Sequence, residues 1–182
     1  DKNYIDIFEI IGDVETNIEN KELFVSIKNS KNKNTDSPFN NLSGVIFKIN
    51  KSNIKNLLLS PKKKLTIRML AYNNIGKHTI KIYQKNVNDK NQVEFSAISV
   101  KNSNISQNKL SIVNYPIEIK DCNQENLELI VFIGKDFILN EKTSFFIKKI
   151  WVIHEPDTKK EMEKQLIQKN EKKKEITISD VP

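Results

Sequence analysis

The sequence predicts an all-β domain, an antiparallel β-sandwich of the jelly-roll type, followed by a charged C-terminal helical tail. Three observations lead to this prediction. Apolar and polar residues alternate over several stretches, segments rich in Asn, Lys and Ser separate these stretches, and no strand–helix–strand alternation is present. A period of two marks a strand with one buried face, because successive side chains point to opposite sides. Many short strands separated by turns are typical of antiparallel sandwiches and barrels.

The alternating stretches define the expected strands and the side of each strand that faces inward. With the turns between them, they indicate roughly eight to ten strands. We expect the core to contain Ile67, Met69, Ile80, Ile82, Val131 and Ile150. The inward sets, in chain order, are Leu23, Val25 and Ile27; Val45, Phe47 and Ile49; Leu65, Ile67, Met69 and Ala71; His78, Ile80 and Ile82; Val93, Phe95 and Ala97; Leu127, Leu129, Val131 and Ile133; and Phe146, Lys148, Ile150 and Val152.

Polar segments between these stretches are expected as turns and loops. The longest covers residues 29–41, and shorter ones cover 73–76, 86–91 and 101–108. Asn and Gly are frequent there, and both tolerate the positive φ values that turns require. Gly12 and Gly134 are each read as part of a turn. Residues 51–60 are expected to form one helical turn or an edge segment.

The chain changes character after Pro156. Thr158 and Glu161 have the spacing of a capping box, in which both side chains satisfy free amides at a helix start. The run to Lys174 contains good helix formers and neither Gly nor Pro. We therefore divide the chain into a sandwich, residues 1–155, and a helical or partly disordered tail, residues 156–182. This tail is either a solvated helix or a contact helix for a partner, through Met162 and Leu166.

Composition narrows the range of functions. The net charge is +7, but Arg68 is the only arginine, and the lysines are spread along the chain among acidic residues. Specific nucleic-acid binders use Arg for bidentate contacts and gather cations on one face. We therefore expect a lysine-coated surface and no specific nucleic-acid partner. The single cysteine, Cys122, excludes an internal disulfide, and no apolar run is long enough to span a membrane.

No pattern in the sequence indicates catalysis, and we expect no enzyme, catalytic residue, cofactor or metal. His78 and His154 lack partners at metal-ligand spacing, and neither a nucleophile elbow nor a phosphate-binding loop is present. A glycosidase needs two carboxylates on either side of the bond that it cleaves. The chain contains carboxylates, but their spacing in the sequence does not place any two of them in this arrangement. They are Glu94, Glu118, Asp121, Glu125 and Glu128.

Aromatic side chains are the candidate ligand contacts. Exposed rings in sugar-binding sandwiches stack on sugar rings, whereas rings in strands commonly serve core or cross-strand packing. Both interpretations apply to the candidates here. The candidates for ligand or partner contact are four aromatic residues of the sandwich and two apolar residues of the tail: Tyr72, Tyr83, Tyr115, Trp151, Met162 and Leu166.

The order of the strands resembles that of known jelly-roll families. The segment 64–73 is followed by 78–84, and the segment 143–154 closes the domain before the charged tail. This layout resembles jelly-roll domains of the galactose-binding and carbohydrate-binding-module type. Through Asn114-Tyr115-Pro116-Ile117 it is also loosely similar to spirochaetal flagellar filament outer-layer proteins, although it lacks their tryptophan and glycine content in the middle strands. The second resemblance implies a periplasmic sheath protein that assembles around a filament.

The leading hypothesis is a non-catalytic structural or assembly protein of an extracytoplasmic bacterial structure, such as a flagellar filament sheath component. Its partners would then be proteins, and its location the periplasm or the cell surface. The alternative is a carbohydrate-binding module with a polysaccharide partner, and a hydrolase comes third. An exposed aromatic row beside a groove favours sugar binding, whereas a broad apolar or oppositely charged patch favours protein assembly.

We predict that a chain ending at Pro156 folds and unfolds at nearly the temperature of the full chain. The few apolar groups of the tail contribute only a few kcal/mol, and the entropy of ordering a helix offsets much of that. Thermal unfolding of both chains measures the effect. Loss of cooperative unfolding in the shorter chain would contradict the division, and loss of co-purifying partners would assign the tail to assembly.

Overall fold

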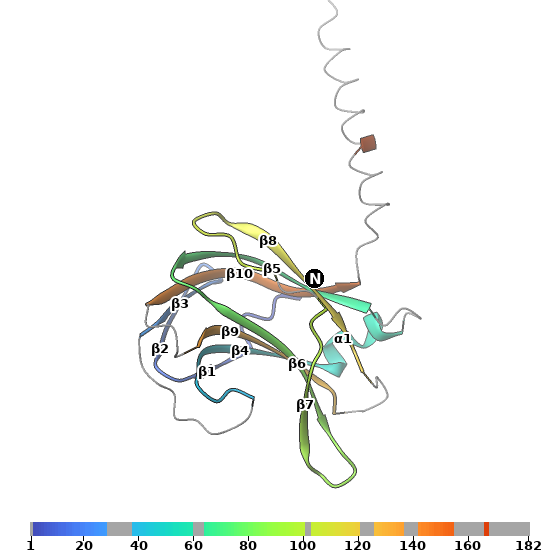
Figure 1. The fold of residues 1–182 in the computed structure, drawn as a ribbon. Helices are drawn as coiled ribbons and strands as arrows, with labels where there is room; N and C mark the ends of the chain where they lie inside the picture. The colour runs from blue at the N-terminus through green and yellow to red at the C-terminus, as the bar shows by residue number, and fades with distance from the viewer. Residues whose placement is uncertain are drawn as a thin grey trace, which may run out of the picture.

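A computed structural model describes residues 2–28, 38–59, 64–100, 103–120, 126–136, 142–154 and 166–167. Over these ranges the chain forms two five-stranded sheets that pack face to face, with one short helix at an end (Figure 1). All neighbouring strands are antiparallel. The predicted fold class, an antiparallel β-sandwich, is confirmed.

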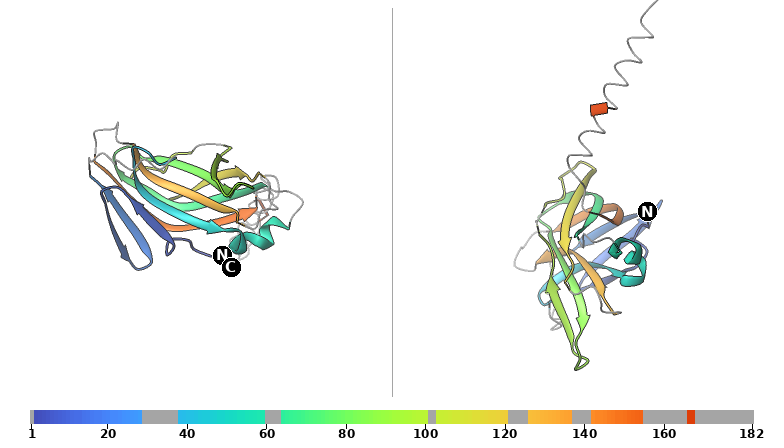
Figure 2. Two further views of the ribbon diagram at one scale, coloured as in Figure 1. Left: turned by 90° about the horizontal axis from the view of Figure 1, so that it is seen from below. Right: turned by 90° about the vertical axis from the view of Figure 1, so that its right-hand side faces the viewer.

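The two sheets contain strands from distant parts of the chain. Sheet A has the order β1 (Phe8–Ile11), β4 (Leu42–Asn50), β9 (Glu128–Asp136), β6 (Thr79–Val87) and β7 (Val93–Ala97). Sheet B has the order β2 (Val14–Glu19), β3 (Glu22–Ile27), β10 (Thr143–His154), β5 (Lys64–Ile75) and β8 (Ser111–Glu118). The helix α1 (Lys51–Leu58) follows β4 directly. The right-hand view of Figure 2 shows the green β6–β7 hairpin extending beyond the rest of the sandwich.

The main core lies between the sheets and is built by the inward sides of the strands. Of the residues expected there, Ile67, Met69, Ile82, Val131 and Ile150 are buried, and Ile80 is half-buried and packs against the same core. The prediction is therefore confirmed for five of these residues, with Ile80 at the border of the core. Burial of apolar side chains is the dominant favourable contribution to the free energy of folding.

A second apolar cluster lies on the opposite, outer face of sheet A. It consists of Phe39, Leu42, Ile46, Ile130 and Phe132, all of them buried. Successive residues of β9 therefore alternate between two apolar environments, which explains why its sequence reads as an almost continuous apolar run. The sequence predicted the inner face of sheet A and did not reveal this outer cluster.

Two strands have a different phase from the predicted one. In β7, Val93 is 51% exposed, and Phe95 packs on the outer cluster, because β7 is the edge strand of sheet A. In β10, Phe146 and Lys148 do not face the core, whereas Ile150 and Val152 do. The register of β10 against β5 shifts between Ile147 and Lys149, and a bulge of this kind reverses the side that later residues face.

Five segments also differ from the predicted secondary structure. Gly12 forms a turn with φ of +81°, as expected, but Gly134 lies inside β9, opposite Gly44 on β4. A Cβ on Gly134 would lie 2.7 Å from the Cα of Gly44, so the two strands leave no room for a side chain there. Residues 51–58 form a true helix, and the strands β1, β2 and β8 were not predicted.

Little of the predicted tail falls within the described residues. Leu166 and Ile167 are helical and exposed, whereas the capping box and Met162 lie outside the described ranges. The domain boundary near residue 155 therefore stays a prediction. Among the described residues, no helix has both the length and the apolar character needed to cross a membrane.

We predict that Ile67→Ala lowers the free energy of unfolding by roughly 2–5 kcal/mol, because the cavity is left in the main core. The matched control is Ile112→Ala, an isoleucine of the same sheet that is 55% exposed. It should change stability by about 0.5 kcal/mol or less. Urea denaturation of the two variants measures both values, and equal losses would show that the assignment of faces in sheet B is wrong.

Candidate functional site

His78, one of the two histidines, has a structural role at the start of β6. Its Nε2 accepts a hydrogen bond from the backbone N–H of Ile105, with an N–N distance of 3.1 Å. Burial lowers the pKa of His78, because the charged imidazolium is poorly solvated there. Within the described ranges, no three His, Cys, Asp or Glu side chains lie close enough together to hold a metal ion.

Tyr115, a candidate ligand contact, lies inside the core instead. It is 1% exposed, and its hydroxyl donates a hydrogen bond of 2.9 Å to the carbonyl oxygen of Ser103. The same burial raises the pKa of Tyr115. Together with His78 it fastens the segment from Ser103 to Ile105 onto the sandwich. Its ring cannot stack on a ligand, and this part of the prediction is wrong.

The outer face of sheet A carries a row of polar residues beside the apolar cluster. The register places Asn50 of β4, Glu128 of β9 and Lys85 of β6 directly side by side across three strands. Residues that pair in this way point to the same side of a sheet. The next row towards the apolar cluster holds Ile130 and Tyr83. Of the predicted contact residues that the structure describes, Tyr83 alone lies beside this polar row.

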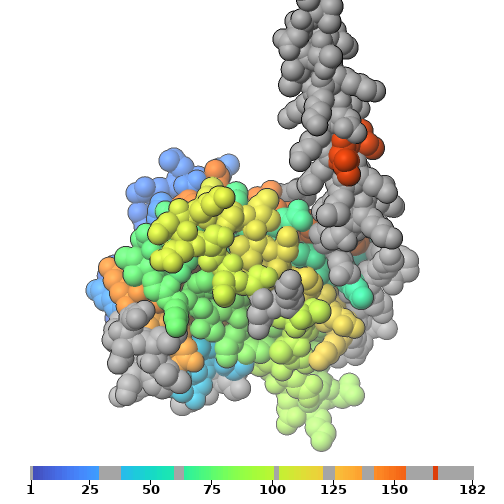
Figure 3. Space-filling view, turned by 45° about the horizontal axis from the view of Figure 1, so that its top comes forward, coloured from blue at the N-terminus to red at the C-terminus, as the bar shows by residue number. Residues whose placement is uncertain are grey.

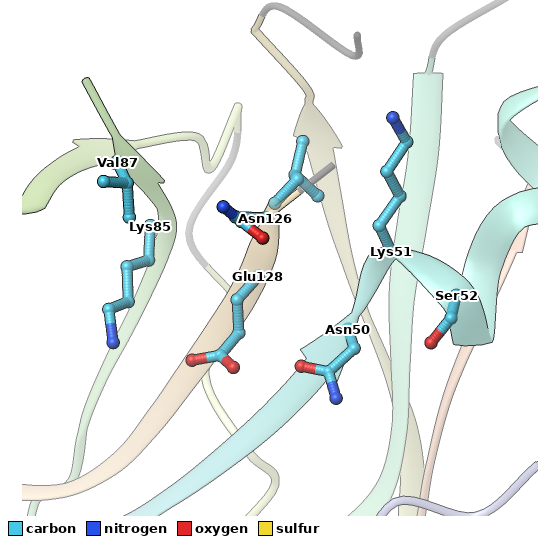
Figure 4. A pocket seen from close by; sticks show the side chains of 8 residues that line it. Asn50, Lys51, Ser52, Lys85, Val87, Asn126 and Glu128 are labelled. Atoms are coloured by element: carbon cyan, nitrogen blue, oxygen red, sulfur yellow. The ribbon is translucent and has the colours of Figure 1, made fainter. Parts of the chain in front are cut away.

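Two adjoining hollows open over the polar row. Their volumes are about 440 Å³ and 530 Å³, and both are lined by Asn50 and Glu128. The remaining lining of the first is Lys51, Ser52, Lys85, Val87, Asn126 and Leu127. The remaining lining of the second is Lys2, Ile7, Phe8, Glu9, Lys48 and Asn53. We call the two hollows together the sheet A groove. Figure 4 shows Glu128 in the first hollow, between Lys85 and Asn50.

Glu128 carries a buried oxygen atom in the groove whose hydrogen-bonding capacity is not used within the described residues. Its Oε1 atom is buried and has no hydrogen-bond partner among the described residues. A buried acceptor without a partner costs roughly 1–3 kcal/mol, and more when it is charged. Such a cost is recovered when a bound molecule supplies the missing donor. In Figure 4 the carboxylate is directed into the space between β6 and β4.

The neighbours of Glu128 add both hydrogen-bond donors and hydrogen-bond acceptors to the groove. Lys48 is held by Glu9, with 2.7 Å between Nζ and Oε2, and this contact raises the pKa of Lys48. Asn50 precedes α1, and its side chain makes no capping hydrogen bond there. The first turn of α1 contains no acidic residue, so the helix end adds a partial positive charge to the groove. The groove therefore suits a ligand with many hydroxyl groups.

Aromatic rings form the border between the groove and the apolar cluster. The ring of Phe39 lies 5.8 Å from that of Phe132, 5.9 Å from Tyr83 and 6.0 Å from Phe95, measured between centroids. The contacts with Tyr83 and Phe95 are edge-to-face, a favourable arrangement for aromatic pairs. Tyr83 and Phe95 are half-buried, so each keeps part of its ring accessible beside the polar row.

The other predicted contact residues lie elsewhere. Tyr72 on β5 and Trp151 on β10 occupy the outer face of sheet B, and both are half-buried. Leu166 is exposed in the tail, and Met162 lies outside the described residues. The structure does not bring the six candidates together. The residues that form the groove, Glu128 excepted, were not singled out from the sequence, because only the strand register places Asn50, Lys85 and Glu128 side by side.

Comparison with known proteins gives similarity of fold without similarity of sequence. No family model and no curated protein matches the chain. One similar solved structure is the CBM22-1-GH10 module pair of Clostridium thermocellum xylanase 10B complexed with xylohexaose, with a TM-score of 0.50 and 10% identity. It matches over 85% of this chain and 27% of that chain. The CBM22-1 xylan-binding domain of Paenibacillus barcinonensis Xyn10C gives a TM-score of 0.49 at 7% identity, over 83% of this chain and 87% of that chain.

These similarities concern the fold alone. The fold shared with the xylanase module pair, at a TM-score of 0.50, confirms the resemblance to jelly-roll domains of the carbohydrate-binding-module type. None of the comparisons supports the resemblance to flagellar filament outer-layer proteins, and the sheath hypothesis is therefore not carried further.

We predict that the free energy of unfolding falls as the pH is lowered through about 6.5, the ordinary pKa of histidine. His78 stays neutral in the folded chain because its pKa is lowered, whereas the unfolded chain takes up the proton. Protonation therefore favours unfolding, by at most about 1.4 kcal/mol per pH unit for one proton.

Urea denaturation between about pH 7.5 and pH 5.5, above the range in which carboxylates titrate, measures this slope. His78→Gln should remove the slope and leave a pH-independent stability. The control is His154→Gln at the exposed end of β10, which should keep it. A slope that survives in His78→Gln would assign the effect to another group.

Proposed function

We propose that this domain binds carbohydrate without catalysis, and that it holds a polysaccharide in the sheet A groove. The observation that carries the proposal is the buried, unpartnered Oε1 atom of Glu128 at the centre of a polar row. A sugar hydroxyl supplies the donor that this atom lacks. The fold adds support, because the xylanase module pair of similar fold was solved with xylohexaose bound.

The polar row matches the chemistry of sugar hydroxyls. Each hydroxyl donates one hydrogen bond and accepts others, so a sugar ring needs acceptors and donors side by side. Glu128 accepts, the ammonium of Lys85 donates, and the amides of Asn50 and Asn126 do both. The exposed part of the Tyr83 ring lies in the adjacent row and offers an apolar face for the C–H groups of a sugar.

Binding, and not hydrolysis, is the activity that these residues support. A glycosidase places two carboxylates on either side of the scissile bond, one of them as acid and the other as base or nucleophile. Glu9 and Glu128 both line the second hollow, but Lys48 holds Glu9 by an ion pair of 2.7 Å. We therefore assign Glu128 to ligand binding. We also propose that the domain works in the periplasm or at the cell surface, where it would meet polysaccharides such as xylan.

We predict that Glu128→Gln and Lys85→Met each weaken binding of a neutral polysaccharide by about tenfold to a hundredfold. A hydrogen bond to a charged group contributes roughly 1.5–3 kcal/mol, and both changes keep the size of the side chain. Affinity electrophoresis and calorimetry with soluble xylan, glucan, mannan and agarose measure the effect.

The matched control is Glu19→Gln, an exposed carboxylate on the edge strand β2 of sheet B. It should leave binding unchanged, and unfolding curves check that each variant is folded. If Glu128→Gln and Lys85→Met bind every polysaccharide as the original chain does, the groove is not the site. Absence of binding to the whole panel would remove the proposed function itself.

A further inference from the structure

The outer face of sheet B carries a second set of residues suited to a ligand, on the side of the sandwich opposite the groove. Trp151 of β10 pairs in register with Arg68 of β5, and Arg68 pairs with Asn114 of β8. The three side chains therefore form one row across three strands. Figure 3 views the molecule with sheet B turned towards the reader, and the yellow atoms of β8 lie near the centre.

The groups of this row are fixed in orientation by their neighbours. The Nε of Arg68 donates a hydrogen bond of 2.8 Å to Oδ1 of Asn114. The ammonium of Lys149 lies 4.8 Å from the centroid of the Trp151 ring, within the range of a cation–π contact. The contact holds a cation beside the only tryptophan of the chain. The two terminal NH₂ groups of Arg68 stay available to a ligand.

Apolar and aromatic residues continue the same face. Leu70 pairs with Ile112, which is 55% exposed. Next to them, the Phe146 ring lies between those of Phe24 and Tyr72, with centroid distances of 4.7 Å and 4.8 Å. Phe24 is 38% exposed. Neighbouring apolar side chains that are exposed in this way are a feature of interaction sites.

The charge of this face indicates what it binds. Arg68 and Lys149 have no carboxylate partner among the described residues, whereas the lysines at the β2–β3 end of the sheet do. There, Lys28 pairs with Glu15 at 3.0 Å and Lys148 with Glu22 at 3.6 Å. Two unpaired cations beside an aromatic ring complement a ligand that combines negative charge with an apolar surface. The planar guanidinium fits a carboxylate through two parallel hydrogen bonds.

We propose that the outer face of sheet B is a second binding surface, which takes an acidic polysaccharide. A sugar carboxylate binds the guanidinium of Arg68, a second carboxylate or the same one contacts Lys149, and a sugar packs against the part of the Trp151 ring that Lys149 leaves uncovered. This surface shares no residue with the sheet A groove. The proposal rests on the proposed function in one respect, since in both cases the ligand is a carbohydrate. The groove suits the hydroxyl groups of a sugar, whereas this face suits its carboxylates.

Because Trp151 is the single tryptophan of the chain, its fluorescence reports on binding at this surface. Titration with polygalacturonate, a polymer of acidic sugars, should change the fluorescence of Trp151, whereas neutral xylan should leave it unchanged. Arg68→Gln should weaken binding of polygalacturonate about tenfold or more, and Arg68→Lys should restore only part of it, because lysine cannot bind a carboxylate with two parallel hydrogen bonds. Glu128→Gln, in the groove, should leave this binding unchanged.

Lys28→Gln is the matched control, since it removes one cation of the same sheet that already has a carboxylate partner. Equal weakening by Lys28→Gln and Arg68→Gln would mean general charge attraction and would overturn the proposal. So would unchanged fluorescence on adding polygalacturonate. Sedimentation that shows a dimer lost in Arg68→Gln or Ile112→Ala would assign the face to a second copy of the chain instead. Loss of xylan binding in Glu128→Gln is a separate result and tests the groove alone.

Discussion

The burial of β9 on both of its faces is the constraint on which the rest of the structure depends. Leu129, Val131 and Ile133 face the main core, while Ile130 and Phe132 face the outer cluster. A strand enclosed in this way needs a neighbour on each side and a cover on each face, and β4, β6, sheet B and Phe39 provide them. On the outer face this enclosure ends at Ile130, and Glu128 is the next residue of β9 that faces the same side. The groove exists because the apolar cluster of the outer face stops before the strand does, whereas the main core continues to Leu127.

A sandwich leaves only its two outer faces for ligands, because the inner faces form the core. The two outer faces of this domain are chemically different. Sheet A presents amides, a carboxylate and ammonium groups beside a closed aromatic cluster, whereas sheet B presents Trp151 and Arg68 beside an open aromatic row. In both cases the groups that act together are one residue from each of several strands. The backbone positions of such a row are fixed relative to one another, since the strands that carry them are joined by hydrogen bonds.

The sequence predicts well which side of a strand faces the core, and it predicts poorly which residues of different strands lie side by side. Alternation alone assigns Leu23, Val25 and Ile27 to the core, because period two is a property of each strand by itself. It fails at Phe146, where a bulge changes the phase, and at Gly134, where the reason for glycine is the nearby Cα of Gly44. Both causes lie on a partner strand far away in the chain. The same limit hides the polar row, since nothing local shows that Glu128 stands between Asn50 and Lys85.

The positions of the last two strands have a consequence for how the chain acquires its structure during synthesis. β10, the last strand among the described residues, is the central strand of sheet B, and β9, the strand before it, is the central strand of sheet A. While the ribosome is still adding these segments, β3 has no neighbour but β2, and β4 none but β1. Only the separate two-stranded pairs β2–β3, β1–β4, β5–β8 and β6–β7 are available to the nascent chain, and isolated two-stranded pairs are marginal in water. Folding therefore waits until His154 has emerged, and proceeds through long-range pairings that are slow to form. Until that moment the apolar sides of the earlier strands stay uncovered, and exposed apolar surface of this kind makes an incompletely folded chain prone to aggregation.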